Sequence, residues 1–188
     1  MDELTIYLKT GRYNKISLEQ ILNKKIIITK NHINNIYFTR SCGFNIINLF
    51  EKYGYIFMDD DYILLVSKNG MLLRYIPEDK ITDKICKIAI QQNVYALRYV
   101  PIDKITDKIC KMAVQQNGTI IEYILYNKIT DEICKISVQQ TGYALEYIPD
   151  DKQTDEICRI SVEQNKGALN YVPRDKKHLF IKNENNNI

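Results

Sequence analysis

The feature that most constrains the fold is a 24-residue repeat in the second half of the chain. Equivalent positions of successive repeats carry Cys86, Cys110, Cys134 and Cys158. Tyrosine, lysine, Thr-Asp and glutamine series follow the same interval, and residues 75–170 hold four complete units without insertion or deletion. A register kept over four units predicts a stack of identical supersecondary elements, each burying its apolar face against the next.

Each unit contains the signals of two short helices. In the first unit, Thr82 is a suitable N-cap, because its hydroxyl can accept a hydrogen bond from an amide of the first turn. The apolar spacing predicts a helix over Asp83–Gln92 with a wide buried face. Asn93 is typical of a helix C-terminus, and its equivalents at 117 and 141 are each followed by glycine. A second, shorter helix is predicted over about 95–99, where the next proline stops it.

Two helices per unit predict an all-α fold, an α-solenoid of short two-helix repeats of about 24 residues, stacked with either hand. A β-solenoid of one coil per unit is the alternative. Three features count against it: the Thr-Asp cap, the helical spacing of the apolar residues, and the lack of strict alternation between apolar and polar residues. The strand motif of leucine-rich repeats is absent, and tetratricopeptide and ankyrin units are longer.

The pattern weakens toward the N-terminus, which divides the chain into four predicted regions. These are an N-terminal helical cap (1–50), a degenerate repeat (51–74), the four-unit array with its closing turn (75–173), and a C-terminal tail that is partly disordered (174–188). Within the cap, Ser17–Gln20 is a candidate capping box, and 42–47 is similar to the turn and second helix of a repeat. Three successive isoleucines make a short strand over 25–29 an alternative there.

Composition excludes several functional classes. The net charge of +3 is too mild to indicate nucleic acid or an acidic membrane as a partner. The densest apolar stretch, 62–66, has five residues, whereas a membrane span needs about 20. No secretory signal is visible, so we expect a reducing intracellular setting with free thiols. The excess of Ile, Lys, Asn and Tyr, which have A/T-rich codons, suggests an AT-rich genome.

The repeat motif resembles a known family. It is carried by 99–101 (Tyr-Val-Pro), 106–110 (Thr-Asp-Lys-Ile-Cys), 116–118 (Gln-Asn-Gly) and 144–147 (Ala-Leu-Glu-Tyr). This motif resembles the repeat of unknown function that is multiplied in giant DNA viruses of amoebae, the mimivirus relatives. The resemblance covers the array well, 51–74 loosely, and none of the first 50 residues. It implies a helical repeat of undetermined function in the host cytoplasm, the viral factory or the virion, with no catalytic residue to carry over.

The repeated cysteines and tyrosines suggest three kinds of chemistry: zinc binding, disulfide formation and stacking on nucleic-acid bases. Equivalent positions of stacked helices lie about 8–10 Å apart, too far for four cysteines to share a zinc ion or to form disulfides. We therefore expect the four cysteines to be small buried hydrophobes. The tyrosine series is either a stacking platform for single-stranded nucleic acid or, as we favour, packing with the hydroxyl at the surface. The Asp-Lys pairs of the turns are expected to neutralise each other.

The remaining candidates for catalysis are few. The carboxylates of 59–61 and 150–151 precede predicted helices, where capping and the helix dipole favour acidic residues. His32 and His178 lie in the segments least like the array, and no nucleophile, phosphate-loop or dinucleotide motif is present. We expect no enzyme activity, no metal site and no cofactor.

The most informative positions form an outward stripe on the first helix of each unit. They follow i, i+3, i+7 spacing on one helix face and comprise Lys84, Lys87, Gln91, Lys108, Lys111, Gln115, Glu132, Lys135, Gln139, Glu156, Arg159 and Glu163. Counted unit by unit, the stripe charge runs +2, +2, 0 and −1, while the core positions barely change. Either a partner selects these residues, or a solvated face has drifted.

We therefore predict a non-enzymatic scaffold whose graded face docks a viral or host protein. The alternative is a nucleic-acid-binding module that uses Lys84, Lys87, Lys108 and Lys111 together with the basic residues before position 50. A third hypothesis is self-association, because one end of the array is basic and the other acidic.

Overall fold

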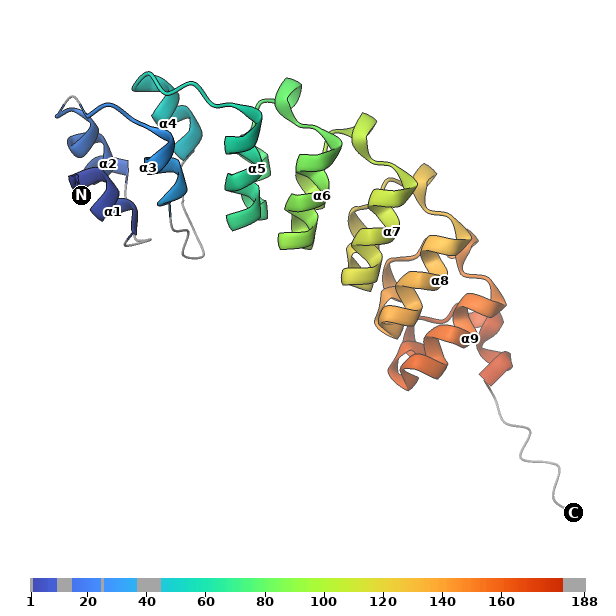
Figure 1. Ribbon diagram of the computed structural model, residues 1–188. Helices are drawn as coiled ribbons and strands as arrows, with labels where there is room; N and C mark the ends of the chain where they lie inside the picture. The colour runs from blue at the N-terminus through green and yellow to red at the C-terminus, as the bar shows by residue number, and fades with distance from the viewer. Residues whose placement is uncertain (1, 10–14, 25, 37–44, 181–188) are drawn as a thin grey trace, which may run out of the picture. The chain divides into compact units, whose positions relative to one another are not determined.

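A computed structural model of the chain describes residues 2–9, 15–24, 26–36 and 45–180, and all their regular secondary structure is helical (Figure 1). Helices follow one another in tandem and pack against their neighbours, which confirms the predicted all-α repeat fold. The chain forms two compact units, residues 1–104 and 105–188. Each described helix is too short or too polar to cross a membrane.

The first unit holds the N-terminal helices and the first repeats. Its α-helices are α1 (Glu3–Lys9), α2 (Lys15–Leu22), α3 (Lys30–Asn34), α4 (Ile46–Lys52), α5 (Asp59–Lys68) and α6 (Asp83–Gln92). Its 3-10 helices are η1 (Gly70–Tyr75), η2 (Glu78–Lys80), η3 (Val94–Tyr99) and η4 (Ile102–Lys104). Helix α1 packs on α2 and α3, α3 packs on α5, and α5 lies side by side with α6 (Figure 1).

The second unit repeats the pattern of one α-helix followed by 3-10 helices. Its α-helices are α7 (Asp107–Gln116), α8 (Asp131–Gln140) and α9 (Asp155–Gln164). Its 3-10 helices are η5 (Gly118–Tyr123), η6 (Tyr126–Lys128), η7 (Gly142–Tyr147), η8 (Asp150–Lys152), η9 (Lys166–Tyr171) and η10 (Arg174–Phe180). Helix α8 packs between α7 and α9.

Details of the N-terminal region differ from the sequence predictions. The capping box at Ser17–Gln20 is wrong, because α2 already begins at Lys15 and places Ser17 inside the helix. The alternative of a strand is wrong for 26–29, because the described residues include no second strand to pair with it. Asn45 caps an α-helix, α4, through hydrogen bonds that its side chain accepts from two backbone amides. Cys42 and the last six or so residues, which the sequence predicts to be disordered, lie outside the described residues.

The repeat α-helices form where the sequence predicts them. Helix α6 has the predicted bounds, and in α6 to α9 a threonine hydroxyl accepts a hydrogen bond from the backbone amide three residues later, at 3.3–3.4 Å. One face of each helix is buried, as at Ile85, Cys86, Ala89 and Ile90 of α6. The degenerate repeat follows the same plan in α5 and η1.

The second helix of each repeat is a 3-10 helix, and the asparagine before it has a different role from the one predicted. Asn93 has φ −152°, which is extended and not the left-handed conformation of a helix C-cap. Its side chain instead accepts a hydrogen bond from the Tyr95 amide at 3.0 Å, so it caps the start of η3. Asn69, Asn117 and Asn165 cap η1, η5 and η9 in the same way.

Successive repeats are joined at the glycine that begins η1, η5 and η7. The amide of Gly118 donates to Oε1 of Gln140, the last residue of the next α-helix, at 2.7 Å. The hydroxyl of Ser137 donates to the Gly118 carbonyl at 2.7 Å. A Cβ at Gly118 would lie 2.3 Å from the Ser137 carbonyl oxygen, closer than real Cβ contacts allow. The same close approach occurs at Gly70 and Gly142.

This glycine is present wherever a later α-helix of the same unit packs on the 3-10 helix. Val94 and Lys166 stand at the equivalent positions, at the start of η3 and η9. The glycine therefore serves close helix approach, since its backbone needs no left-handed conformation.

We predict that Gly118→Ala lowers the free energy of unfolding by about 1–3 kcal/mol, because the new methyl group meets a backbone oxygen that cannot move without shifting α8. Lys166→Ala is the matched control at the equivalent position, and it should change stability by less than about 0.5 kcal/mol. Urea unfolding followed by circular dichroism measures both. Equal effects of the two substitutions would contradict the close-approach role.

Candidate functional site

The stripe predicted from the sequence lies on the outward face of α6 to α9. Nine of its twelve residues are exposed, and Lys87, Lys111 and Lys135 are half-buried. The apolar positions between them, such as Ile85 and Cys86, are fully buried. Burial thus separates the stripe from the core in every repeat.

In the second unit the stripe is bridged by ion pairs between neighbouring repeats. Lys111 Nζ lies 2.7 Å from a Glu132 carboxylate oxygen, and Lys135 Nζ lies 2.8 Å from one of Glu156. The hydrogen bond to Glu156 raises the pKa of Lys135. In each pair the cation of one helix meets the acid at the start of the next. In the third 24-residue repeat, the two charged stripe residues, Glu132 and Lys135, are therefore both paired within the chain.

The cations at the other stripe positions have no such partner. Lys84 and Lys87 on α6, and Lys108 on α7, form no ion pair with any described residue. The same holds for Arg159 on α9. Of the four lysines assigned to the nucleic-acid alternative, Lys111 already has an acidic partner. On α7, Lys108, Lys111 and Gln115 line an open hollow of about 570 Å³.

A second variable stripe, which the sequence analysis missed, lies on the 3-10 helices. It is the residue directly before each repeat tyrosine, and it reads Arg74, Arg98, Glu122, Glu146 and Asn170. All five side chains are exposed. The sequence signal was the change from arginine in the first unit to glutamate in the second, next to an invariant tyrosine.

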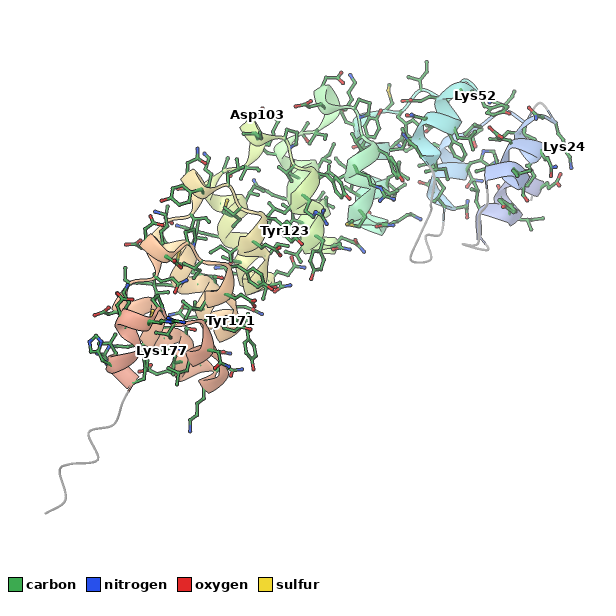
Figure 2. The ribbon with its side chains drawn as sticks, turned by 180° about the vertical axis from the view of Figure 1, so that it is seen from behind. Lys24, Lys52, Asp103, Tyr123, Tyr171 and Lys177 are labelled. Carbon is green, nitrogen blue, oxygen red and sulfur yellow. The ribbon has the colours of Figure 1, made fainter. Side chains whose placement is uncertain are left out.

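The tyrosines beside this stripe are half-buried in the inner repeats, and Tyr171 of the last repeat is exposed. Tyr123 and Tyr171 lie along one side of the second unit (Figure 2). Charged neighbours engage the rings: the Arg74 guanidinium lies 4.4 Å from the Tyr75 ring centroid. The charge of Glu146 raises the pKa of Tyr147 and Tyr171. The rings therefore support the stripe residues rather than forming an open stacking platform.

A hollow of about 290 Å³ opens beside this stripe in the first unit. Arg74, Arg98, Glu78 and Tyr99 line it, together with apolar residues of the same repeats.

The four repeat cysteines are fully buried, as predicted for small hydrophobes. Burial raises the pKa of Cys86 and Cys134 to about 11, and it also raises the pKa of Cys110 and Cys158. These thiols are therefore protonated at neutral pH and unsuited to nucleophilic or metal chemistry.

The acidic pairs and the histidines have structural partners. Asp61 is buried, accepts hydrogen bonds at 3.0 Å from the Met58 amide and the Tyr55 hydroxyl, and so completes the start of α5. Asp151 accepts a hydrogen bond from the Tyr126 hydroxyl. In the turns of the first unit, Lys80 pairs with Asp79 at 3.4 Å and Lys104 with Asp103 at 3.3 Å, as expected. In the second unit the prediction is wrong, because Lys176 donates to the Gln153 carbonyl and Asp151 accepts from Tyr126 instead. No three His, Cys, Asp or Glu residues of the described chain gather closely enough to hold a metal ion.

His32 is buried and has a fixed tautomer. The Thr29 amide donates to its Nδ1 at 2.9 Å, so the ring proton is on Nε2, which lies 3.1 Å from both Asp2 carboxylate oxygens. The Thr5 amide and His32 together lower the pKa of Asp2 to about 2. Both ring nitrogens of His32 thus serve to anchor the N-terminal helices.

Comparison with known families finds one match. A family described as a domain of unknown function, DUF4116, matches residues 61–106 and 130–176. The chain is similar to this family over both segments. Each segment spans two consecutive repeats, α5 with α6 and α8 with α9, so the family unit corresponds to a pair of 24-residue repeats. Comparisons with curated proteins and with solved structures find no match.

We predict that the repeat thiols do not react in the folded protein. With a pKa of about 11, only about one in a thousand of the Cys86 and Cys134 thiols is ionised at pH 8. The pKa of Cys110 and Cys158 is also raised, and burial blocks access to all four. In a Cys42→Ser variant, a maleimide should label no cysteine at pH 8 and should label all four in denaturant, as mass spectrometry will show. Labelling of a repeat cysteine under native conditions would contradict the burial.

We also predict a weak, salt-dependent coupling between Lys135 and Glu156. A double-mutant cycle to alanine should give about 0.5 kcal/mol at low salt and almost nothing at 1 M salt, because the pair is exposed. Lys135 and Glu163, which form no ion pair, provide the control cycle. A coupling that is equal in both cycles would show that the ion pair is absent in solution.

Proposed function

We propose that the protein is a non-enzymatic helical-repeat scaffold that docks a partner protein on the outward face of α6. The observation that carries this proposal is which stripe cations form ion pairs within the chain. Lys84 and Lys87 face outward without an ion-pair partner in the described chain, whereas Lys111 and Lys135 of the second unit are paired internally. A partner with an acidic surface would complete at α6 the pairing that neighbouring repeats provide in the second unit.

The geometry of the repeat supports a binding role. Helix α6 is held rigidly by its buried face and its Thr82 cap, so the outward lysines and Gln91 project from a fixed backbone. Rigid, extended repeat surfaces are suited to protein recognition. The nucleic-acid alternative is less well supported, because Lys111 is already neutralised by Glu132.

The proposal includes a biological setting. The resemblance of the repeat motif to giant-virus repeats suggests a viral protein that acts in the infected host cell, in the cytoplasm or the viral factory. The partner is then a viral or host protein present in that compartment.

The test is affinity capture from infected cells with three forms of the full chain: wild type, Lys84→Glu/Lys87→Glu, and Arg159→Glu. The Arg159 variant is the matched control, since it reverses an exposed stripe cation without an ion pair in another repeat. We expect a protein captured by wild type and by Arg159→Glu to be lost from the double variant, with unchanged thermal unfolding. Mass spectrometry identifies the captured proteins.

Two outcomes would contradict this proposal. An identical set of captured proteins for all three forms would show that the α6 face does not select a partner. Captured material that disappears on nuclease treatment, and that binds less as salt rises, would instead favour the nucleic-acid module.

A further inference from the structure

The 3-10 helices carry side chains of opposite charge at equivalent positions of the two units. In the first unit, η1 and η3 carry Arg74 and Arg98, and in the second, η5 and η7 carry Glu122 and Glu146. Within each unit the two charges occupy equivalent positions of adjacent repeats. The packing between adjacent 3-10 helices is the same kind of contact in both units. The two arginines are therefore separated by one repeat, as are the two glutamates.

Each face also presents an exposed tyrosine three residues before one of its charges. These are Tyr95 before Arg98 and Tyr143 before Glu146, with 46% and 45% of their surface exposed. Residues i and i+3 of a 3-10 helix lie one above the other on the same side, so ring and charge share one surface. Tyrosine and arginine are the residues most enriched among those that dominate binding energy.

Two of the four charged groups have aromatic neighbours. The Arg74 guanidinium lies 4.4 Å from the Tyr75 ring centroid, and the charge of Glu146 raises the pKa of Tyr147 and Tyr171. In the first unit, Arg74 and Arg98 border the hollow of about 290 Å³, which has room for a carboxylate side chain. Held charges lose little side-chain entropy on pairing, which favours binding.

We propose that this surface binds a second copy of the chain: the Arg74/Arg98 face of one copy pairs with the Glu122/Glu146 face of another. The same repeat interval on both faces allows both Arg–Glu pairs to form together, each as a charge-assisted hydrogen bond. Tyr95 and Tyr143 then pack at the contact. This face lies on the 3-10 helices and not on the α6 stripe, so the proposal does not depend on the proposed function.

The test is sedimentation equilibrium of the full chain, with reductant, up to about 200 µM, a range that detects micromolar association. We expect wild type to exceed the 22.1 kDa of one chain at low salt and to return to it at high salt. Arg74→Glu/Arg98→Glu and Glu122→Arg/Glu146→Arg should each remain monomeric, with dissociation constants raised at least about tenfold. An equimolar mixture of the two variants should associate again, because acidic faces then meet basic ones.

Restoration by mixing also shows that both variants are folded, and circular dichroism checks this independently. The Lys84→Glu/Lys87→Glu variant should associate like wild type, which separates this interface from the α6 face. A wild-type monomer at every concentration in low salt would overturn the proposal. So would association of either variant alone at wild-type strength, or a mixture that stays monomeric.

Discussion

The fold depends on one contact, the close approach between the first residue of a 3-10 helix and the next repeat helix. Glycine is required there because any Cβ would meet the carbonyl oxygen of Ala89, Ser137 or Ser161. The glutamine that ends the next helix accepts a hydrogen bond from the glycine amide, so this buried backbone donor is paired. One small residue and one amide side chain thus set the distance between repeats, and the buried isoleucines and cysteines fill the space that this distance leaves.

Because the constraint lies at the junction, the outward positions of both helices are free to vary. On the α-helices, part of this variation is itself structural: Lys111 and Lys135 meet the acid that opens the next helix. On the 3-10 helices, the variable residue directly precedes a tyrosine, and its charge is positive in the first unit and negative at Glu122 and Glu146 in the second. Variation at outward positions therefore produces ion pairs within the chain on the α-helices. On the 3-10 helices it produces two faces of opposite charge.

Sequence patterns correctly predicted most of the structural features that depend on residues close together in the chain. The bounds of α6, the threonine caps and the burial of the cysteines follow from residues within one turn of each other. The roles of Gly118 and Gln140 did not follow, since their hydrogen bond joins residues 22 apart that meet only when repeats stack. Asn93 was placed correctly at a helix end but misassigned, because an extended asparagine that caps the following helix has the same local sequence as a C-cap.

The stripe shows why variation within a repeat is incomplete evidence for a binding site. Lys87, Lys111 and Lys135 occupy one repeat position and have the same charge, yet Lys111 and Lys135 are paired within the chain. Variation marks a partner surface only where the varying side chain is exposed and its charge is not balanced by a neighbouring repeat. That stricter criterion retains the exposed charges Lys84, Lys108, Arg159 and Glu163, and the half-buried Lys87 is the other stripe cation without an ion pair among the described residues. The 3-10 stripe becomes a candidate for a different reason, since the charge that balances one face is carried by the other face of the same chain. The two surfaces lie on different helices of the repeat, so their occupants need not compete.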